Sequence, residues 1–234
     1  MTFTVIATCP RTGKAGSCQS TSTPAVGWRV ADVVRGRGVV AVQAHADWRQ
    51  LQLAKRILEF GHSPAKVLKE LSESDPHFDW RQVAILDFAG RAATWTGPRA
   101  RPWAGELVGE HFVVTGNVLA GPQVLEAMAA AFRASADLEL EERLLRTVEA
   151  GRDAGGQPEG QTSSALLVHD RYEFPIVNLR VDVDAEPIGA LRRIFDWFAP
   201  LIPYYVERTL DPSSVVPKKQ WLEARGLSAN PFRP

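Results

Sequence analysis

The sequence contains few of the residues that build metal sites and disulfide frameworks. Its 234 residues include two cysteines, Cys9 and Cys18, and five histidines, no two of which are at metal-ligand spacing. Two cysteines do not make a disulfide framework. A chain of this length buries a large hydrophobic core without such cross-links. We therefore expect a fold that needs no metal and no cofactor.

Long hydrophobic runs and an excess of one charge are also missing. No stretch approaches the roughly 18 apolar residues of a membrane span, and the N-terminus lacks the basic start and apolar segment of a signal peptide. Lys and Arg together number 27, as do Asp and Glu, so the net charge is zero. Proteins that coat nucleic acid carry a basic excess instead. We expect a cytoplasmic protein that takes a small-molecule substrate and has no nucleic-acid or membrane partner.

Several common functional motifs are absent from the sequence. It has no phosphate loop of the form GxxxxGK[ST], no GxGxxG after a strand, no CxxC, no HExxH and no GxSxG. These motifs carry nucleotide binding, zinc binding and the nucleophile of α/β-hydrolases. Their absence removes most of those functions from consideration.

Hydrophobic periodicity predicts a chain in which strands alternate with pairs of helices. Alternating or buried apolar runs predict strands, which we place at residues 2–8, 16–20, 38–45, 82–88, 92–96, 111–115, 164–169 and 176–183. Apolar stripes with helical spacing predict helices, which we place from Trp48 to Gly61, from Ser63-Pro64 to Pro76, after Gly121-Pro122, over 138–150 and around 188–198.

This order predicts an α+β fold. Strand hairpins separated by adjacent pairs of helices favour a four-layer αββα sandwich, in which two antiparallel sheets lie between helical layers. A doubly wound sheet would alternate single strands with single helices, which this order does not. We expect one domain over residues 1–210, followed by a tail over 211–234 that contains Pro and Ser.

Thr2 is the most informative candidate residue. A small residue after methionine allows Met1 to be removed, which would leave Thr2 with a hydroxyl and a free α-amine. An α-amine has a pKa of about 7.7–8.0 and can accept a proton near neutral pH. One residue would then supply both the nucleophile and its general base. The alternative is that Thr2 merely starts an edge strand.

Asn117 is the second candidate catalytic residue. It lies in the run Thr115–Pro122, between a predicted strand and a predicted helix N-terminus, where developing negative charge is stabilised. Its side-chain amide could stabilise an oxyanion, an interaction whose loss elsewhere costs about 3–4 kcal/mol. The alternative is a turn asparagine with left-handed backbone geometry.

The end of the second predicted strand supplies further candidates. Ser20 and Thr21 would lie near Thr2 if the two strands are neighbours, and we expect both to contact substrate. Cys18 needs a basic neighbour to become a thiolate nucleophile. The sequence shows none nearby, which favours a small buried residue at this position.

Three more residues are expected to line the site. Gln43 and His45 end the third predicted strand at alternating positions and so face one side. His45 would titrate near neutral pH, although a single histidine at a strand end is more often structural. Trp103 belongs, with Trp95, Arg99 and Arg101, to a polar and aromatic loop that could form one wall of a pocket.

The sequence resembles the DUF1028 family, which we place in the N-terminal-nucleophile (Ntn) hydrolase superfamily. The resemblance extends over nearly the whole chain except the tail, and the run TGNVLAGP is its most specific part. It is carried by MTFTVIA at 1–7, AVG at 25–27, VVAVQA at 39–44, RQVAILDFAGRAATWTG at 81–97, PWAG at 102–105, TGNVLAGPQVLEAMAAAF at 115–132, AGGQPEGQTSSALLV at 154–168 and LRVDVD at 179–184.

The resemblance implies an αββα fold and an N-terminal nucleophile at Thr2. The expected activity is that of an amidohydrolase acting on a small amide, a cyclic imide or a ureido-type compound, with Asn117 at the oxyanion and Ser20 and Gln43 orienting substrate and amine. Two features depart from the pattern. Thr21 stands where several members carry a larger or basic side chain, and Lys14 lies in the preceding hairpin rather than where threonine-dependent members place a lysine.

Two other functions remain open. The same fold could bind a small polar ligand without catalysis, or it could use Cys18 as the nucleophile. We also expect a homodimer, because a cluster of aromatic residues near the C-terminus would otherwise leave exposed apolar surface. Those residues are Trp197, Phe198, Tyr204, Tyr205 and Trp221.

Overall fold

The structure is a computed structural model that describes residues 1–227. The chain divides into two compact units, Met1–Leu191 and a second that begins at Arg192. The sequence had suggested a boundary near residue 210, but that position is the end of a helix, α6 (Ile202–Leu210), within the second unit.

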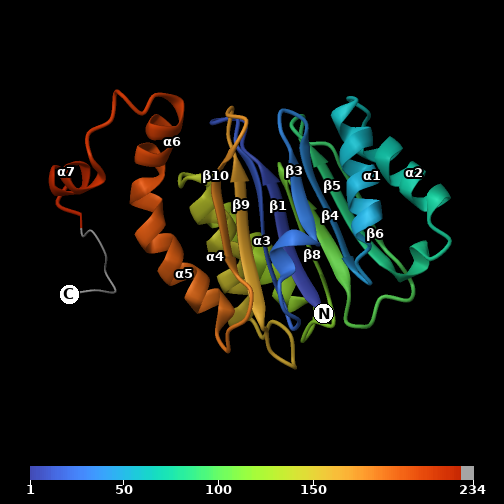
Figure 1. Cartoon of the computed structure of the whole chain (residues 1–234). Coiled ribbons are helices and arrows are strands. Elements are labelled where there is room, and N and C mark those ends of the chain that lie inside the picture. Colours follow the sequence, from blue (N-terminus) through green and yellow to red (C-terminus); the bar gives the residue numbers. More distant parts are fainter. Residues whose placement is uncertain (228–234) are drawn as a thin grey trace. The chain divides into compact units, whose positions relative to one another are not determined.

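The first unit contains two sheets, and every strand pair in them is antiparallel (Figure 1). The larger sheet has the order β10-β9-β2-β1-β8-β7, and the smaller has the order β3-β4-β5-β6. The strands of the larger sheet are β1 (Thr2–Thr8), β2 (Ala15–Thr21), β7 (Gly105–Gly109), β8 (Phe112–Asn117), β9 (Ser163–His169) and β10 (Pro175–Val181). Those of the smaller sheet are β3 (Ala31–Val34), β4 (Gly38–Ala44), β5 (Arg81–Asp87) and β6 (Ala92–Thr96).

Two pairs of helices cover the outer faces of the sheets. Helices α1 (Trp48–Glu59) and α2 (Pro64–Ser74) pack on the smaller sheet, whereas α3 (Gln123–Ala134) and α4 (Leu140–Asp153) pack on the larger one (Figure 1). The prediction of a mixed α+β fold with two antiparallel sheets is confirmed, and the layers are compatible with an αββα order. Strands β3 and β7 were not predicted.

Local sequence signals explain where the first helix pair begins and ends. The side chain of Asp47 accepts a hydrogen bond from the Arg49 amide and caps α1, and Ser63 caps α2 in the same way with Pro64 at its first position. Gly61 follows α1 with a φ of 87°, a left-handed conformation that glycine adopts without strain. These caps set the ends of both helices.

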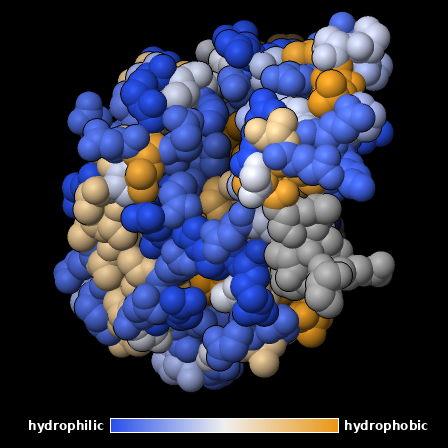
Figure 2. All heavy atoms as spheres, turned by 90° about the vertical axis from the view of Figure 1, so that its left-hand side faces the viewer, coloured by the Kyte–Doolittle hydropathy of each residue, from blue (hydrophilic) through white to orange (hydrophobic). Residues whose placement is uncertain are grey.

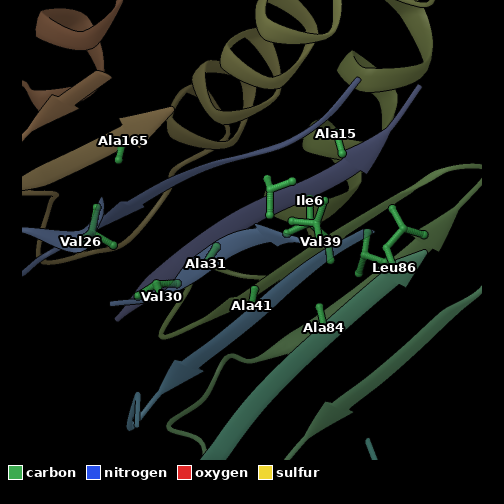
Figure 3. Close-up of a cluster of buried hydrophobic side chains, with 12 residues drawn as sticks. Ile6, Ala15, Val26, Val30, Ala31, Val39, Ala41, Ala84, Leu86 and Ala165 are labelled. Carbon is green, nitrogen blue, oxygen red and sulfur yellow. The ribbon is translucent and has the colours of Figure 1, made fainter. Parts of the chain in front are cut away.

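The core between the sheets is built mainly from small aliphatic side chains (Figure 3). Alanines and valines such as Ala41, Ala84 and Val39 are fully buried there together with Ile6 and Leu86. Side chains alternate between the faces of a strand, so Thr2 and Thr4 share the inner face of β1 with Ile6. Phe3 lies on the opposite face, against α4 near Gly151. The small size of these core residues lets the two sheets pack closely. Thr2 and Thr4, at the polar end of β1, therefore face the smaller sheet.

The second unit has its own small core. Helix α5 (Pro187–Phe198), which was predicted, spans the boundary, and α6 and α7 (Lys218–Glu223) follow it. Tyr204 and Trp221 are buried here with Leu201 and Leu222. These two aromatic residues therefore do not supply the exposed surface from which a dimer was expected, and the dimer stays a prediction.

The chain also contains three short 3-10 helices within the described residues, and its surface carries scattered apolar residues. The 3-10 helices are Val26–Trp28, Phe78–Trp80 and Ala199–Leu201. On the face shown in Figure 2, hydrophobic residues form small separate groups among hydrophilic ones. Within residues 1–227, no helix is both long and apolar enough to span a membrane.

Candidate functional site

Thr2 lies at the start of a central strand. β1 pairs with β2 on one side and with β8 on the other, which contradicts the alternative that Thr2 merely starts an edge strand. The register places Thr2 directly opposite Thr21 and also opposite Asn117. Three residues predicted from separate parts of the sequence therefore meet at one end of the larger sheet.

The hydroxyls of Thr2 and Thr21 form a directed chain. Thr21 Oγ1 donates a hydrogen bond to the carbonyl oxygen of Met1, and a threonine hydroxyl has a single hydrogen to donate. Thr2 Oγ1 and Thr21 Oγ1 lie 3.1 Å apart, so Thr2 must be the donor in that bond. While Met1 is present, the hydrogen of the Thr2 hydroxyl is engaged with Thr21.

A cavity of about 290 Å³ opens beside this pair and is lined by Met1, Ala44, His45, Arg101 and Asn117. Thr2 itself is only 5 % exposed and does not line the cavity. Because Met1 is bonded to Thr2 and forms part of the wall, removing Met1 would bring the Thr2 amine to the cavity surface. Pockets for small ligands begin at about 300 Å³, so the space suits a small molecule.

The surroundings of the chain start favour a neutral amine. Burial, followed by the positive charges of Arg101 and Arg29, lowers the pKa of the Met1 α-amine, while the negative charge of Glu159 opposes that shift. An amine with a lowered pKa is unprotonated in a larger fraction of molecules at neutral pH. This end of the sheet therefore favours an amine that can accept a proton.

Gln82, on β5 of the smaller sheet, fixes the orientation of Asn117. Gln82 Nε2 donates to the carbonyl oxygens of Gly105, at 3.0 Å, and Gly116, at 2.9 Å. Carbonyl oxygens can only accept, so the Gln82 amide has one allowed orientation. Its Oε1 then accepts from Asn117 Nδ2 at 3.0 Å and from Gln43 Nε2 at 2.8 Å. The second hydrogen on Asn117 Nδ2 has no partner within the described residues.

Gln43 therefore contributes to the frame of the site rather than to its cavity. It is fully buried, and its Oε1 accepts a hydrogen bond from Thr4 Oγ1 at 2.6 Å. The line from Thr4 through Gln43 and Gln82 to Asn117 joins the two sheets behind Thr2. Each of these four side chains makes at least one hydrogen bond within the line, which stabilises polar groups in a buried position.

The backbone is strained at Ala44, which lines the cavity, and at Val118, which directly follows Asn117. Ala44 has a φ of 68° and Val118 a φ of 54°, which are left-handed values that cost roughly 1–3 kcal/mol in a residue with a β-carbon. Asn117 itself ends β8, so the alternative of a left-handed turn asparagine is wrong. Strain of this kind concentrates at functional sites.

Ser20 and Cys18 face away from the cavity. They lie opposite Phe3 and Val5, on the helix-facing side of the larger sheet. Ser20 Oγ donates instead to the carbonyl oxygen of Ser163 at 2.9 Å, so it does not reach Thr2 as expected. Cys18 is fully buried and in no disulfide, as its small-residue interpretation requires.

His45 and Trp103 have different surroundings. His45 lines the cavity and packs edge-on against Trp80, with ring centroids 4.9 Å apart. It also lines a second cavity of about 280 Å³, together with His77, Trp80 and Arg81. The ring of Trp103 lies over Gly105 and is not part of the cavity wall.

Gln82 was not among the residues predicted for the site, whereas Arg101 belongs to the loop that was expected to form a pocket wall and does line the cavity. Gln82 had a signal, because it is an amide within an otherwise apolar strand, and such a residue needs a partner when buried. Among residues 1–227, no group of histidine, cysteine or acidic side chains is arranged to hold a metal ion.

Comparison with known proteins identifies the family. The model of a family of unknown function, DUF1028, matches residues 2–191. The chain belongs to the DUF1028 family. The crystal structure of protein SPO2555 from Silicibacter pomeroyi, which carries the same family model, is 32% identical over 83% of this chain and 84% of that one, with a TM-score of 0.78. The DUF1028 chain matches none of the curated proteins.

Two other solved structures are more distant from this DUF1028 chain. Thiobacillus denitrificans BPH is 18% identical over 74% of this chain and all of its own, with a TM-score of 0.43. Anbu (ancestral beta-subunit) from Yersinia bercovieri is 10% identical over 88% of this chain and 97% of its own, with a TM-score of 0.41. TM-scores this low support no argument about function.

Proposed function

We propose that this chain is an amidohydrolase of the N-terminal-nucleophile type, with Met1 removed and Thr2 as its catalytic residue. Its substrate is a small amide, a cyclic imide or a ureido-type compound. The observation that carries the proposal is that Met1 lines the cavity, while the Thr2 hydroxyl lies directly behind it, paired with Thr21.

Removal of Met1 would also change the hydrogen bond between the two threonines. The carbonyl oxygen that accepts from Thr21 belongs to Met1 and leaves with it. Thr21 is then able to donate its hydrogen to Thr2 Oγ1, which releases the hydrogen of the Thr2 hydroxyl for transfer to the new α-amine. Loss of one residue thus exposes the base and reverses the bond that held the nucleophile's proton.

The proposed reaction has two halves. Thr2 Oγ1 attacks the carbonyl carbon of the substrate while the α-amine takes the hydroxyl proton. The tetrahedral oxyanion accepts a hydrogen bond from the second Asn117 Nδ2 hydrogen, and preorganised donors of this kind stabilise developing negative charge. The C–N bond then breaks, the leaving nitrogen takes the proton from the amine, and an ester remains on Thr2. Water, activated by the amine, hydrolyses that ester and releases the acid.

The two alternatives are less well supported. Cys18 is fully buried on the opposite face of the sheet from Thr2, so its sulfur is enclosed. A ligand-binding protein without catalysis would use the same cavity, but it would need neither the Thr2–Thr21 hydroxyl pair nor the neutral amine that the surroundings favour.

The proposal is tested by ammonia release from a panel of simple amides and ureido compounds, and by chromatographic loss of cyclic imides, whose ring opening releases no ammonia. We expect turnover of at least one class by the wild type, none by Thr2→Ala and partial activity by Thr2→Ser, which keeps a hydroxyl. Unchanged turnover in Thr2→Ala would end the proposal. Thermal stabilisation by a compound that the wild type never turns over would support the binding alternative.

A further inference from the structure

We propose that the substrate carries a carboxylate, which is bound at the cavity by Arg101. This inference rests on the proposed function, because it names the class of compound that reaches Thr2. Three observations support it: the position of Arg101, the charges near the cavity and the planar shape of the Arg101 guanidinium group.

Arg101 is held at the cavity through its backbone. Its carbonyl oxygen accepts a hydrogen bond from the amide of Val118 at 3.1 Å, and Val118 directly follows Asn117. The neighbouring bond from the Leu119 amide to the Trp103 carbonyl oxygen, at 3.0 Å, ties the same two loops together. Arg101 and Asn117 therefore line one cavity from adjoining segments. A ligand in this cavity that contacts Asn117 also lies near Arg101.

The charged side chains that act on the cavity are mainly positive. Its lining residues include no carboxylate. Within the described chain, neither Arg101 nor Arg29 has an acidic side chain at ion-pair distance, whereas the buried Arg81 nearby is bridged to Asp75 at 2.7 Å. Glu159 is the one acidic residue that acts appreciably on the Met1 amine. Because the whole chain is neutral, this excess is a local feature.

A single arginine fits a carboxylate better than a phosphate. The planar guanidinium fork matches the two oxygens of a carboxylate with two parallel hydrogen bonds. Phosphate sites in proteins commonly add several backbone N–H groups from a glycine-rich loop or a helix N-terminus, and neither of these lines this cavity. A small organic acid also suits a volume of about 290 Å³.

Binding of two matched probes to the Thr2→Ala variant tests the inference, with Met1 removal confirmed by intact mass. Glutarate and glutaramide have the same carbon chain, but only glutarate is charged. Isothermal titration calorimetry should show glutarate binding about tenfold or more tightly than glutaramide. Arg101→Gln should abolish that preference. Arg56→Gln, which removes the same charge from an exposed position on α1, should leave it intact.

The outcomes are separable from those of the proposed function. Equal affinity for the two probes, no binding of glutarate, an unchanged preference in Arg101→Gln, or tighter binding of inorganic phosphate would each overturn the inference. Selective glutarate binding by Thr2→Ala, with no amide turnover by the wild type, would leave a carboxylate-binding site at Arg101 and remove the hydrolase. Because Arg101 is exposed, the variant should fold, which an unchanged thermal midpoint would confirm.

Discussion

Thr2 and Thr21 face each other across β1 and β2, with their hydroxyl oxygens 3.1 Å apart. Both side chains are buried, and the Met1 carbonyl oxygen fixes the direction of the bond between them. Burying a hydroxyl group destabilises the folded state unless the hydroxyl forms hydrogen bonds, and both hydroxyls of this pair form them. The pair is therefore the feature of this chain most directly linked to its proposed chemistry.

Thr21→Val should slow acylation of Thr2 while changing the fold little. Valine has the shape of threonine but cannot hydrogen-bond to the Thr2 hydroxyl. We expect the rate of Thr2 acetylation by p-nitrophenyl acetate to fall about tenfold or more. Thr21→Ser, which keeps the hydroxyl, should recover most of the rate. Equal rates in the valine and serine variants would show that the hydroxyl pair has no part in the reaction.

Gln82→Leu should destabilise the protein strongly. The substitution removes the acceptor of the Gln43 and Asn117 side-chain amides and the Gln82 hydrogen bond to the Gly116 carbonyl oxygen. Unsatisfied buried polar groups cost about 1–3 kcal/mol each, so the free energy of unfolding should fall by about 2 kcal/mol or more in urea denaturation.

The control for that experiment is Gln123→Leu, which makes the same chemical change at an exposed position. Its free energy of unfolding should stay within about 0.5 kcal/mol of the wild type. If Gln82→Leu were as mild as this control, the bridge between the sheets would not contribute to stability as described.

Stability should fall as the pH is lowered from about 4 to about 2. Hydrogen bonds from Arg49 lower the pKa of Asp47 to about 2, whereas an aspartate in the unfolded chain has a pKa of about 3.9. A carboxyl whose pKa is lowered on folding stabilises the native state above the unfolded pKa. It loses that contribution as the pH falls through the folded value.

Arg49→Gln isolates this effect. The variant removes the two side-chain hydrogen bonds to Asp47, at 3.1 and 2.8 Å, and should flatten the stability curve between pH 4 and pH 2. Arg56→Gln removes an arginine from the same helix, α1, and should keep the wild-type curve. Parallel curves for the two variants in urea denaturation would refute the assignment to Asp47.

The sequence was sufficient to predict most of the first unit. Alternation in residues 2–8 and helical stripes bounded by Ser63-Pro64 and Gly121-Pro122 correspond to β1, α2 and α3. Strands β3 and β7 were missed because they are short and lie at sheet edges. Short edge strands often lack the regular alternation of apolar and polar residues by which a half-buried strand is recognised. Helix α5 was predicted, but α6 and α7 were not. Helix α7 lies beyond residue 210, where prolines and polar residues indicated a tail.

The site was only partly predictable. Thr2, Thr21, Asn117 and His45 do gather at one end of the sandwich. Ser20 was misplaced because neighbours in sequence point to opposite faces of a strand, so it cannot share the face of Thr21. The pairing of Gln82 with Asn117 joins two sheets, and contacts between residues so far apart in sequence leave no local pattern.

The central claim is that Thr2 becomes the N-terminal residue and reacts as a nucleophile, and intact-protein mass spectrometry before and after treatment with p-nitrophenyl acetate tests it most directly. The account predicts a chain lighter by one methionine residue. It also predicts one acetyl group on Thr2 that hydroxylamine removes, as it does an ester, and no such group on Thr2→Ala. Retention of Met1 in a protein that is nevertheless acetylated and turns over amides would contradict the account.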